Sequence, residues 1–207
     1  GLVGCSSAAL RARFATIRQF NVLVEKMLPL IDLSLSEYNW SLAHTYAQVS
    51  GLVLWKVKGS MWTKALNAKQ GGGCGNVYFN RLRASRFAAR GLCDHEAKYT
   101  MFAQLMHQVH YRGAGKLRTS GQAWSAQFRG EGSIDAGGPY RESITNVSTE
   151  LQSRTLPLLV QCPNYNNDAG LNREKWVLNP TATRTMHLAM LEFFGKLMGL
   201  ALRTHDH

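Results

Sequence analysis

The sequence predicts an α+β protein that is mainly helical and carries a few short strands. Apolar residues recur every three or four positions along several long segments, which is the helical period. The remaining apolar runs are short and end at glycine, proline or asparagine, as short strands do. Hydrophobic residues make up 45% of the 207 residues and charged residues 18%. This composition predicts one or two globular domains and excludes a disordered tail.

The first 70 residues are expected to form a helical extension. A helix is predicted from Ser7 to Leu28, with Pro29 ending it. Its apolar face consists of Leu10, Phe14, Ile17 and Val24. A second helical stretch is expected from Ser36 to Lys56, capped by Ser36 and interrupted by Gly51. Both helices are expected to act as packing surfaces.

A linker is predicted at residues 71–76, where four of the five positions from Gly71 to Gly75 are glycine. Glycines are costly to order and have no side chain to bury. We therefore place a domain boundary here, between the helical extension (1–70) and a second domain (77–207). Cys74 lies in this segment and is expected to be exposed.

The second domain begins with a strand at Val77–Phe79, a helix at Lys98–Tyr111 and a strand at Gln122–Phe128. The helix carries its apolar residues on one face, at Phe102, Leu105, Met106 and Val109. A glycine-rich loop at 130–138 follows. Pro139 suits the first turn of the next helix, because its missing N–H is not needed there.

The helix after Pro139 is expected to reach about Gln152. Its buried stripe consists of Tyr140, Ile144, Val147 and Leu151. Glu142 is expected in the first turn, where it would complement the helix dipole. A buried strand at Leu156–Val160 and a polar loop at Cys162–Asp168 come next.

The chain then continues with a strand at Trp176–Leu178, a turn at Asn179–Pro180 and a last helix at Thr185–Arg203. This helix is apolar over most of its circumference, so it is expected to be buried. Gly195 and Gly199 lie four residues apart and would allow another backbone to approach closely. No apolar run approaches the roughly 18 to 20 residues of a bilayer-spanning helix, so no membrane span is expected. Both ends of the chain look cut.

The net charge of +11 comes entirely from residues 1–120, which hold 16 Lys and Arg against 5 Asp and Glu. Such a block can mark contact with nucleic acid or an acidic partner, or form a solvated surface. Four scattered cysteines, without a Cys-x-x-Cys pair, indicate neither a disulfide framework nor a zinc site. They favour a reduced compartment.

Motifs for common chemistries are incomplete. The sequence contains no complete nucleotide-binding glycine loop and no nucleophile elbow. His107 and His110 could face one metal, but no third ligand accompanies them, and surface or capping roles are favoured. Cys93, Asp94 and His95 are adjacent, and sequence neighbours rarely form a catalytic relay.

The glycine-rich loop has two interpretations. Glu131 and Asp135 could act as acid and base if they converged on a pocket. The structural alternative is stronger: Asp135 accepts N–H bonds within the loop, and Glu131 pairs with a cation such as Arg141. The residues alone therefore predict an architectural joint.

The segment from Trp124 to Glu142 resembles the signature near the start of a HECT ubiquitin-ligase domain. The matching positions are Trp124, Gly130, Glu131, Gly132, Asp135, Gly137, Gly138, Arg141 and Glu142. Further similar pieces are Asn80–Arg81, Ala84, Phe102, Gln104, Leu156–Val160, Asn179–Pro180, His187–Leu188 and Phe194–Gly199. The residue sequence of the motif is most similar to that of the large HERC-like branch of the family. The resemblance covers about Val77 to Thr204, the first third of such a domain.

The resemblance implies a truncated HECT N-lobe that follows a helical extension. Such ligases take ubiquitin from a conjugating enzyme onto a cysteine of a C-terminal lobe and pass it to a substrate lysine. That lobe and the enzyme-docking part are expected to lie outside this chain, so no catalytic residue is assigned and the chain is expected to be inactive alone. The matched residues, with Asn179, Pro180, Gly195 and Gly199, are assigned structural roles.

The resemblance further implies ubiquitin and a ubiquitin-conjugating enzyme as partners of the full-length protein. It implies no cofactor or metal, and a location in the cytoplasm with the nucleus as a second site. Gly138→Val is expected to destabilise the N-lobe by a clash at the helix start. Two other functions stay open: a non-catalytic basic module that binds an acidic partner or nucleic acid, and a metal or hydrolytic enzyme that uses His107, His110 or Cys93.

Overall fold

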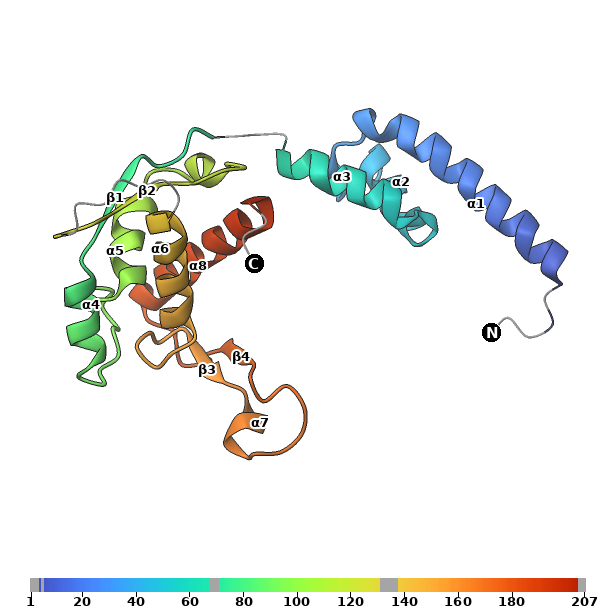
Figure 1. Ribbon diagram of the computed structural model, residues 1–207. Coiled ribbons are helices and arrows are strands. Elements are labelled where there is room, and N and C mark those ends of the chain that lie inside the picture. The colour runs from blue at the N-terminus through green and yellow to red at the C-terminus, as the bar shows by residue number, and fades with distance from the viewer. Residues whose placement is uncertain (1–3, 5, 68–70, 131–137, 205–207) are drawn as a thin grey trace. The chain divides into compact units, whose positions relative to one another are not determined.

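The computed structural model describes residues 4, 6–67, 71–130 and 138–204. The chain divides into two compact units, Gly1–Ala68 and Lys69–His207 (Figure 1). Helices dominate both units, and the strands are short. The predicted α+β, mainly helical class is confirmed.

Over its described residues, 4 and 6–67, the first unit has three helices and three short 3-10 turns. The helices are α1 (Ser7–Met27), α2 (Leu42–Val49) and α3 (Trp55–Asn67), and the turns are Leu28–Leu30, Leu33–Leu35 and Ser50–Leu52. Ser6 begins α1 by accepting a hydrogen bond from the Ala9 N–H at 3.2 Å. The small core between α1 and α3 consists of Val24, Leu28, Val53, Val57 and Met61.

The prediction of a single helix at 36–56 is wrong, because the helix is interrupted before α3. Asn21 of α1 accepts a hydrogen bond from the Leu54 N–H at 2.7 Å and donates one to the Leu52 carbonyl at 3.0 Å. These hydrogen bonds stabilise the interruption at Ser50–Leu52, where Gly51 already disfavours a helix. Ser41, not Ser36, caps α2 by accepting from the His44 N–H.

The second unit alternates helices with two pairs of strands. Its elements are β1 (Asn76–Phe79), α4 (Arg81–Ala88), α5 (Met101–Val109), a 3-10 turn (Ala114–Leu117), β2 (Ser125–Phe128), α6 (Gly138–Leu151), β3 (Leu159–Gln161), α7 (Pro163–Asn166), β4 (Trp176–Leu178) and α8 (Thr185–Thr204). β1 and β2 pair in parallel, with Phe79 opposite Phe128. β3 and β4 form an antiparallel hairpin that projects from the unit with α7 at its end (Figure 1).

The core of the second unit forms around α5, which contacts β1, α6 and α8. Its large, fully buried side chains include Phe79, Phe102, Leu105, Met106, Met190 and Phe193. Phe102 and Phe193 meet edge to face, with their ring centroids 5.4 Å apart. The apolar face predicted for 98–111 is therefore confirmed as the centre of this core.

The outer edge of β1 is occupied by two glutamine side chains of α5. Gln108 accepts from the Tyr78 N–H at 2.9 Å and donates to the Tyr78 carbonyl at 2.8 Å. One helical turn earlier, Gln104 accepts from the Asn80 N–H at 2.7 Å and donates to the Asn80 carbonyl at 3.2 Å. The two amides take the place that part of a third strand would have, so the backbone groups of Tyr78 and Asn80 are satisfied.

Several boundaries differ from the sequence-based prediction. α5 starts at Met101 rather than Lys98, because the Thr100 side chain accepts from the Ala103 N–H as its N-cap. β2 starts at Ser125 rather than Gln122, and β3 covers Leu159–Gln161 rather than Leu156–Val160. The segment expected to be a polar loop at 162–168 contains the short helix α7, and α4 lies where the periodicity alone predicted no helix.

Residues 71–75 are packed into the second unit, so the expectation of a segment with nothing to bury and an exposed Cys74 is wrong. The Cys74 N–H donates to the Ala123 carbonyl at 2.6 Å, and its side chain lies in the core at 4% exposure. At Gly71 an added Cβ would lie 1.9 Å from the Gly115 carbonyl oxygen. Glycine is required here because two backbones come together.

α8 is only partly buried, contrary to the expectation from its apolar circumference. Met190 and Phe193 are in the core, whereas Leu188, Met198 and Leu202 are each more than half exposed. No described atom lies within 4 Å of a Cβ placed on Gly195 or Gly199, so the expected close backbone approach does not occur among the described residues.

α8 is also the one described helix that could cross a membrane by length and composition alone. It has 20 residues and a mean hydropathy of 1.2, so the expectation that no segment is long and apolar enough was too strict. Burial of Met190 and Phe193 accounts for part of this apolar content, because the core helix of a globular unit needs the same residues. The helix also carries an ion pair between Glu192 and Lys196, at 2.9 Å.

Candidate functional site

The first residue of the glycine-rich signature, Trp124, joins β2 to α6. Its indole N–H donates to the Ser143 hydroxyl at 3.0 Å, and that hydroxyl donates to the Tyr140 carbonyl at 2.6 Å. The Trp124 and Tyr140 rings also pack together, with centroids 5.0 Å apart. All three residues are at most 4% exposed. Trp124 therefore fixes the start of α6 against the sheet.

Arg81 links α4 to the same region. Its guanidinium lies 3.7 Å from the centroid of the Phe128 ring and 2.6 Å from a carboxylate oxygen of Glu142. Glu142 is the fifth residue of α6, so the expectation that it lies in the first turn and complements the helix dipole is wrong. Because both partners are about a third to a half exposed, the ion pair orients α4 more than it stabilises the unit.

The centre of the signature falls outside the described residues. Glu131, Gly132, Asp135 and Gly137 all lie there, so their expected loop contacts stay predictions. Arg141, the cation suggested for Glu131, is exposed on α6.

Gly130 has a left-handed backbone with φ of +85°. This conformation costs an L-amino acid roughly 1–2 kcal/mol. We expect Gly130→Ala to lower the free energy of unfolding by about that amount, measured by urea unfolding and circular dichroism. Gly121→Ala is the matched control, since Gly121 has neither positive φ nor a described atom near its Cβ position. Equal effects of both changes would contradict the conformational account.

The clash expected for Gly138→Val has no support in the described residues. No described atom lies within 4 Å of a Cβ at Gly138, and its φ is not in the left-handed region. A clash with the described residues therefore does not explain why the motif has glycine at position 138.

The N-terminus of α5 is held by two carboxylates. Asp94, 2% exposed, accepts from the backbone N–H groups of Lys98, Tyr99 and Thr100 at 2.8 to 3.0 Å and from the Thr100 hydroxyl at 3.0 Å. Glu150, reaching from α6, accepts from the Met101 and Phe102 N–H groups at 2.8 and 2.7 Å. Together they satisfy the unpaired donors at the start of this helix.

The pKa of Glu150 is raised to about 7 overall. Burial is the largest cause and the nearby Asp94 carboxylate also raises the pKa, whereas the two hydrogen bonds from N–H groups lower it. Sequence reasoning missed both carboxylates. Thr100 before an apolar helix is a recognisable cap signal. Nothing in the local sequence indicates that Glu150, 49 residues after Met101, reaches the same helix end.

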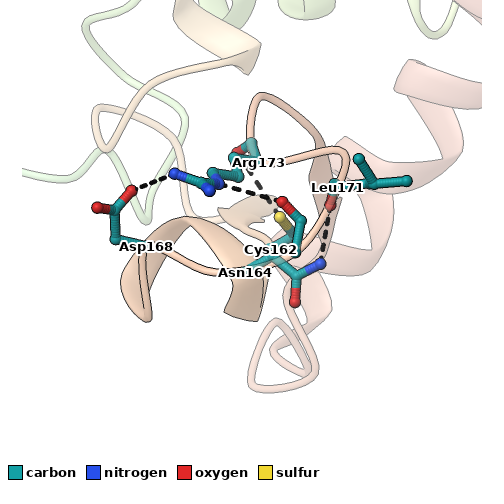
Figure 2. A network of polar contacts seen from close by, with 6 residues as sticks. Cys162, Asn164, Asp168, Leu171 and Arg173 are labelled. Atoms are coloured by element: carbon teal, nitrogen blue, oxygen red, sulfur yellow. Dashed lines mark hydrogen bonds and ion pairs between the residues drawn. The ribbon is translucent and has the colours of Figure 1, made fainter.

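The projecting arm between β3 and β4 is organised by its own polar contacts (Figure 2). Arg173 pairs with Asp168 and donates to the Gly170 carbonyl, while Asn164 donates to the Leu171 carbonyl at 2.8 Å. The Cys162 thiol donates to the Asn172 carbonyl at 3.1 Å. These contacts build a defined loop that leaves Leu171 82% exposed.

The predicted turn at Asn179–Pro180 is confirmed. The Asn179 side chain accepts from the Thr181 N–H at 3.0 Å and donates to the Pro157 carbonyl at 2.8 Å. It thereby fastens the return strand of the arm before α8 begins.

Two of the described cysteines, Cys74 and Cys93, are poorly suited to act as nucleophiles. Burial raises the pKa of the Cys74 and Cys93 thiols, and the Asp94 carboxylate raises that of Cys93 further. A raised pKa lowers the fraction of reactive thiolate. Asp94 is engaged by α5 and His95 contacts His187 at 3.2 Å, so the adjacent Cys93, Asp94 and His95 do not form a relay.

The histidines considered for metal binding have other partners. His107 contacts the Ala97 carbonyl at 2.7 Å. His110 is buried, so the surface role is wrong, but it occupies the C-cap of α5, which agrees with the capping role. It packs against Phe193 and the Lys196 ammonium. Burial and that ammonium lower the pKa of His110. Within the described ranges, no group of three or more His, Cys, Asp or Glu could hold a metal.

A hollow of about 470 Å³ lies between α6 and α8. Its lining includes Trp124, Ile144 and Ser148 on one side and Phe194, Leu197 and Met198 on the other. None of the described residues that line it is charged, so the hollow suits apolar side chains rather than an ionic ligand.

Comparison with known proteins relates both units to one group of enzymes. The chain is 30% identical over 204 residues to "E3 ubiquitin-protein ligase HERC2" of Homo sapiens, which covers 95% of this chain and 4% of that protein. The Mus musculus protein of the same name is 29% identical over the same shares. "Probable E3 ubiquitin-protein ligase HECTD4" of Homo sapiens is 26% identical over 94% of this chain and 5% of that protein. This chain is similar over nearly its whole length to E3 ubiquitin-protein ligases.

The HECT resemblance is thus confirmed, and it reaches beyond the 77–204 segment that carries the motif. The matches extend through the helical first unit, because they cover 94% to 95% of the chain. The chain spans only 4% to 5% of the length of these HECT-type relatives. No family model matches the chain.

Proposed function

We propose that this chain forms the scaffold of the N-terminal lobe of a HECT domain, within a protein that transfers ubiquitin through a cysteine thioester. The observation that carries the proposal is the 204-residue match to E3 ubiquitin-protein ligases. The structure agrees with a scaffold, because Trp124, Asn179 and Arg81 of the matched segments make packing and turn contacts.

On this proposal the partners of the whole protein are ubiquitin and a ubiquitin-conjugating enzyme, and its location is the cytoplasm. The acyl-transfer step needs a thiolate nucleophile. Since the pKa values of Cys74 and Cys93 are raised, we expect the chain alone to be inactive.

We expect the isolated chain to form no reducible ubiquitin adduct when mixed with activating enzyme, conjugating enzyme, ubiquitin and ATP. Non-reducing gels with and without thiol measure this, and the HECT domain of human HERC2 serves as the positive control. A thiol-sensitive adduct on this chain would overturn the expectation. Cys5→Ser, Cys74→Ser, Cys93→Ser and Cys162→Ser would then locate the cysteine.

The scaffold role is tested by grafting residues 77–204 in place of the matched segment of the human relative's HECT domain. A graft that folds and still forms the adduct supports the proposal. A graft that folds, judged by cooperative unfolding, but forms none contradicts it. The same graft with Leu171→Ser, an exposed position on the arm, is the matched control for handling and stability.

A second candidate is a basic binding module, favoured by exposed Arg83, Arg86 and Arg90 in and just after α4. Binding of an oligonucleotide would then weaken steeply as salt rises, because each neutralised phosphate releases counterions. A shallow salt dependence would remove this candidate.

A further inference from the structure

A line of mostly apolar residues along α1, continued by Leu28 just after it, forms a continuous seam. Their spacing alternates between four and three residues over most of the helix, as in one strand of a coiled coil. The seam consists of Leu10, Phe14, Ile17, Asn21, Val24 and Leu28. At 3.6 residues per turn these six positions lie within one narrow arc of the helix surface.

Only the C-terminal half of this seam has a partner in the first unit. Asn21, Val24 and Leu28 are 4% to 9% exposed and pack against the Leu52–Leu54 turn and α3. The N-terminal half continues in the same line, but α1 runs on past the other helices of the unit (Figure 1). There Phe14 is 60% exposed, whereas Leu10 and Ile17 are partly exposed. The uncovered half is therefore an extension of an interface that the fold already uses.

The residues beside the uncovered half are all basic. Arg11 and Arg18 lie along one border of the seam and Arg13 along the other, in the positions that flank a coiled-coil interface. No Asp or Glu occurs on α1 before Glu25. A second copy of α1 would bring arginines next to arginines, which disfavours self-pairing, whereas acidic flanks on another helix would pair with them.

We propose that the seam formed by Leu10, Phe14 and Ile17 binds an amphipathic helix of a partner protein whose apolar stripe is flanked by Asp or Glu. The seam supplies about two helical turns of apolar contact, and the three arginines select the charge of the partner. This role is separate from the ubiquitin-transfer proposal, which concerns the second unit.

The test uses the full 207-residue chain and two synthetic helical peptides of about three heptads, a length that supports coiled-coil pairing. Both peptides carry the same leucine and isoleucine seam. One has Glu at all flanking positions and the other has Lys. Fluorescence anisotropy of the labelled peptides measures binding, and we expect the Glu peptide to bind at least tenfold more tightly.

Three variants locate the binding surface. Phe14→Ser is expected to weaken binding of the Glu peptide at least tenfold. Leu23→Ser is the matched control, because Leu23 is also 60% exposed but lies on the opposite side of α1, and it is expected to change nothing. The triple change Arg11→Glu, Arg13→Glu and Arg18→Glu is expected to reverse the preference toward the Lys peptide.

The proposal is overturned if neither peptide binds, if both bind equally, or if Phe14→Ser and Leu23→Ser behave alike. Sedimentation of the chain alone is expected to show a monomer, and dimerisation lost in Phe14→Ser would instead assign the seam to a second copy. An oligonucleotide that binds and depends on the arginines but not on Phe14 would assign the surface to nucleic acid.

Discussion

Replacing Asp94 with alanine is expected to lower the free energy of unfolding of the second unit by about 4 kcal/mol. The carboxylate is 2% exposed and accepts four hydrogen bonds, three from backbone N–H groups and one from the Thr100 hydroxyl. Alanine leaves these donors without an acceptor, and water cannot easily reach the two that belong to the fully buried Thr100. Because α5 is the centre of the core, the loss at its N-terminus affects the whole unit.

Urea unfolding followed by far-ultraviolet circular dichroism measures this loss. Asp94→Asn keeps one acceptor oxygen and nearly the same volume, so we expect about half of the alanine effect. Asp168→Ala is the control for removing a carboxylate from a surface loop, and its effect should be within about 0.5 kcal/mol. If Asp94→Ala were as mild as Asp168→Ala, the capping account of α5 would be wrong.

The second large effect is a pH dependence that comes from Glu150. Its pKa is about 7 in the folded protein, above the ordinary value of 4.5. Between these values the folded state holds a proton that the unfolded chain has released. The free energy of unfolding therefore falls as pH rises from 4.5 to 7, by about 3 kcal/mol in total, and the contribution levels off above pH 7.

Glu150→Gln isolates this effect, because glutamine cannot titrate. The quantity to measure is the difference in unfolding free energy between wild type and Glu150→Gln at pH 5 and at pH 8. Two buried histidines act in the opposite direction: the pKa values of His110 and His187 are lowered, so the stability they contribute is lost as pH falls. They are present in both proteins, so the difference cancels them. A difference that does not change with pH would contradict a raised Glu150 pKa.

Elements with a strong local pattern were predictable from the sequence. The helix after Pro139 and the strand at Trp176–Leu178 occur where the periodicity placed them, and the last helix differs by one residue. Elements defined by tertiary contacts were not. The break before α3 depends on Asn21, more than thirty residues earlier, and α7 depends on the contacts within its own loop.

The residues of the candidate site likewise divide into those that the sequence predicted and those that it did not. Trp124 and Asn179 were predictable because each belongs to a recognisable sequence pattern. For Trp124 the pattern is the glycine-rich signature, and for Asn179 it is the Asn179–Pro180 turn. The capping roles of Asp94 and Glu150 were not predicted, because a carboxylate that caps a helix from outside it has no periodic signature. Cys74 was misjudged because glycines that permit close backbone contact have the same sequence pattern as glycines in a flexible linker.

The glutamine side chains of α5 along β1 also limit how this unit can recognise other proteins. Extended peptides commonly dock by adding a strand to an open sheet edge, using the backbone groups of that edge. At Tyr78 of β1 and at Asn80 just after it, those groups are already bonded to Gln108 and Gln104, so an incoming strand would have to displace two side-chain amides first. The β1–β2 sheet is thereby protected on this side from edge-to-edge aggregation, and the exposed surfaces of the helices and of the projecting arm are left for recognition.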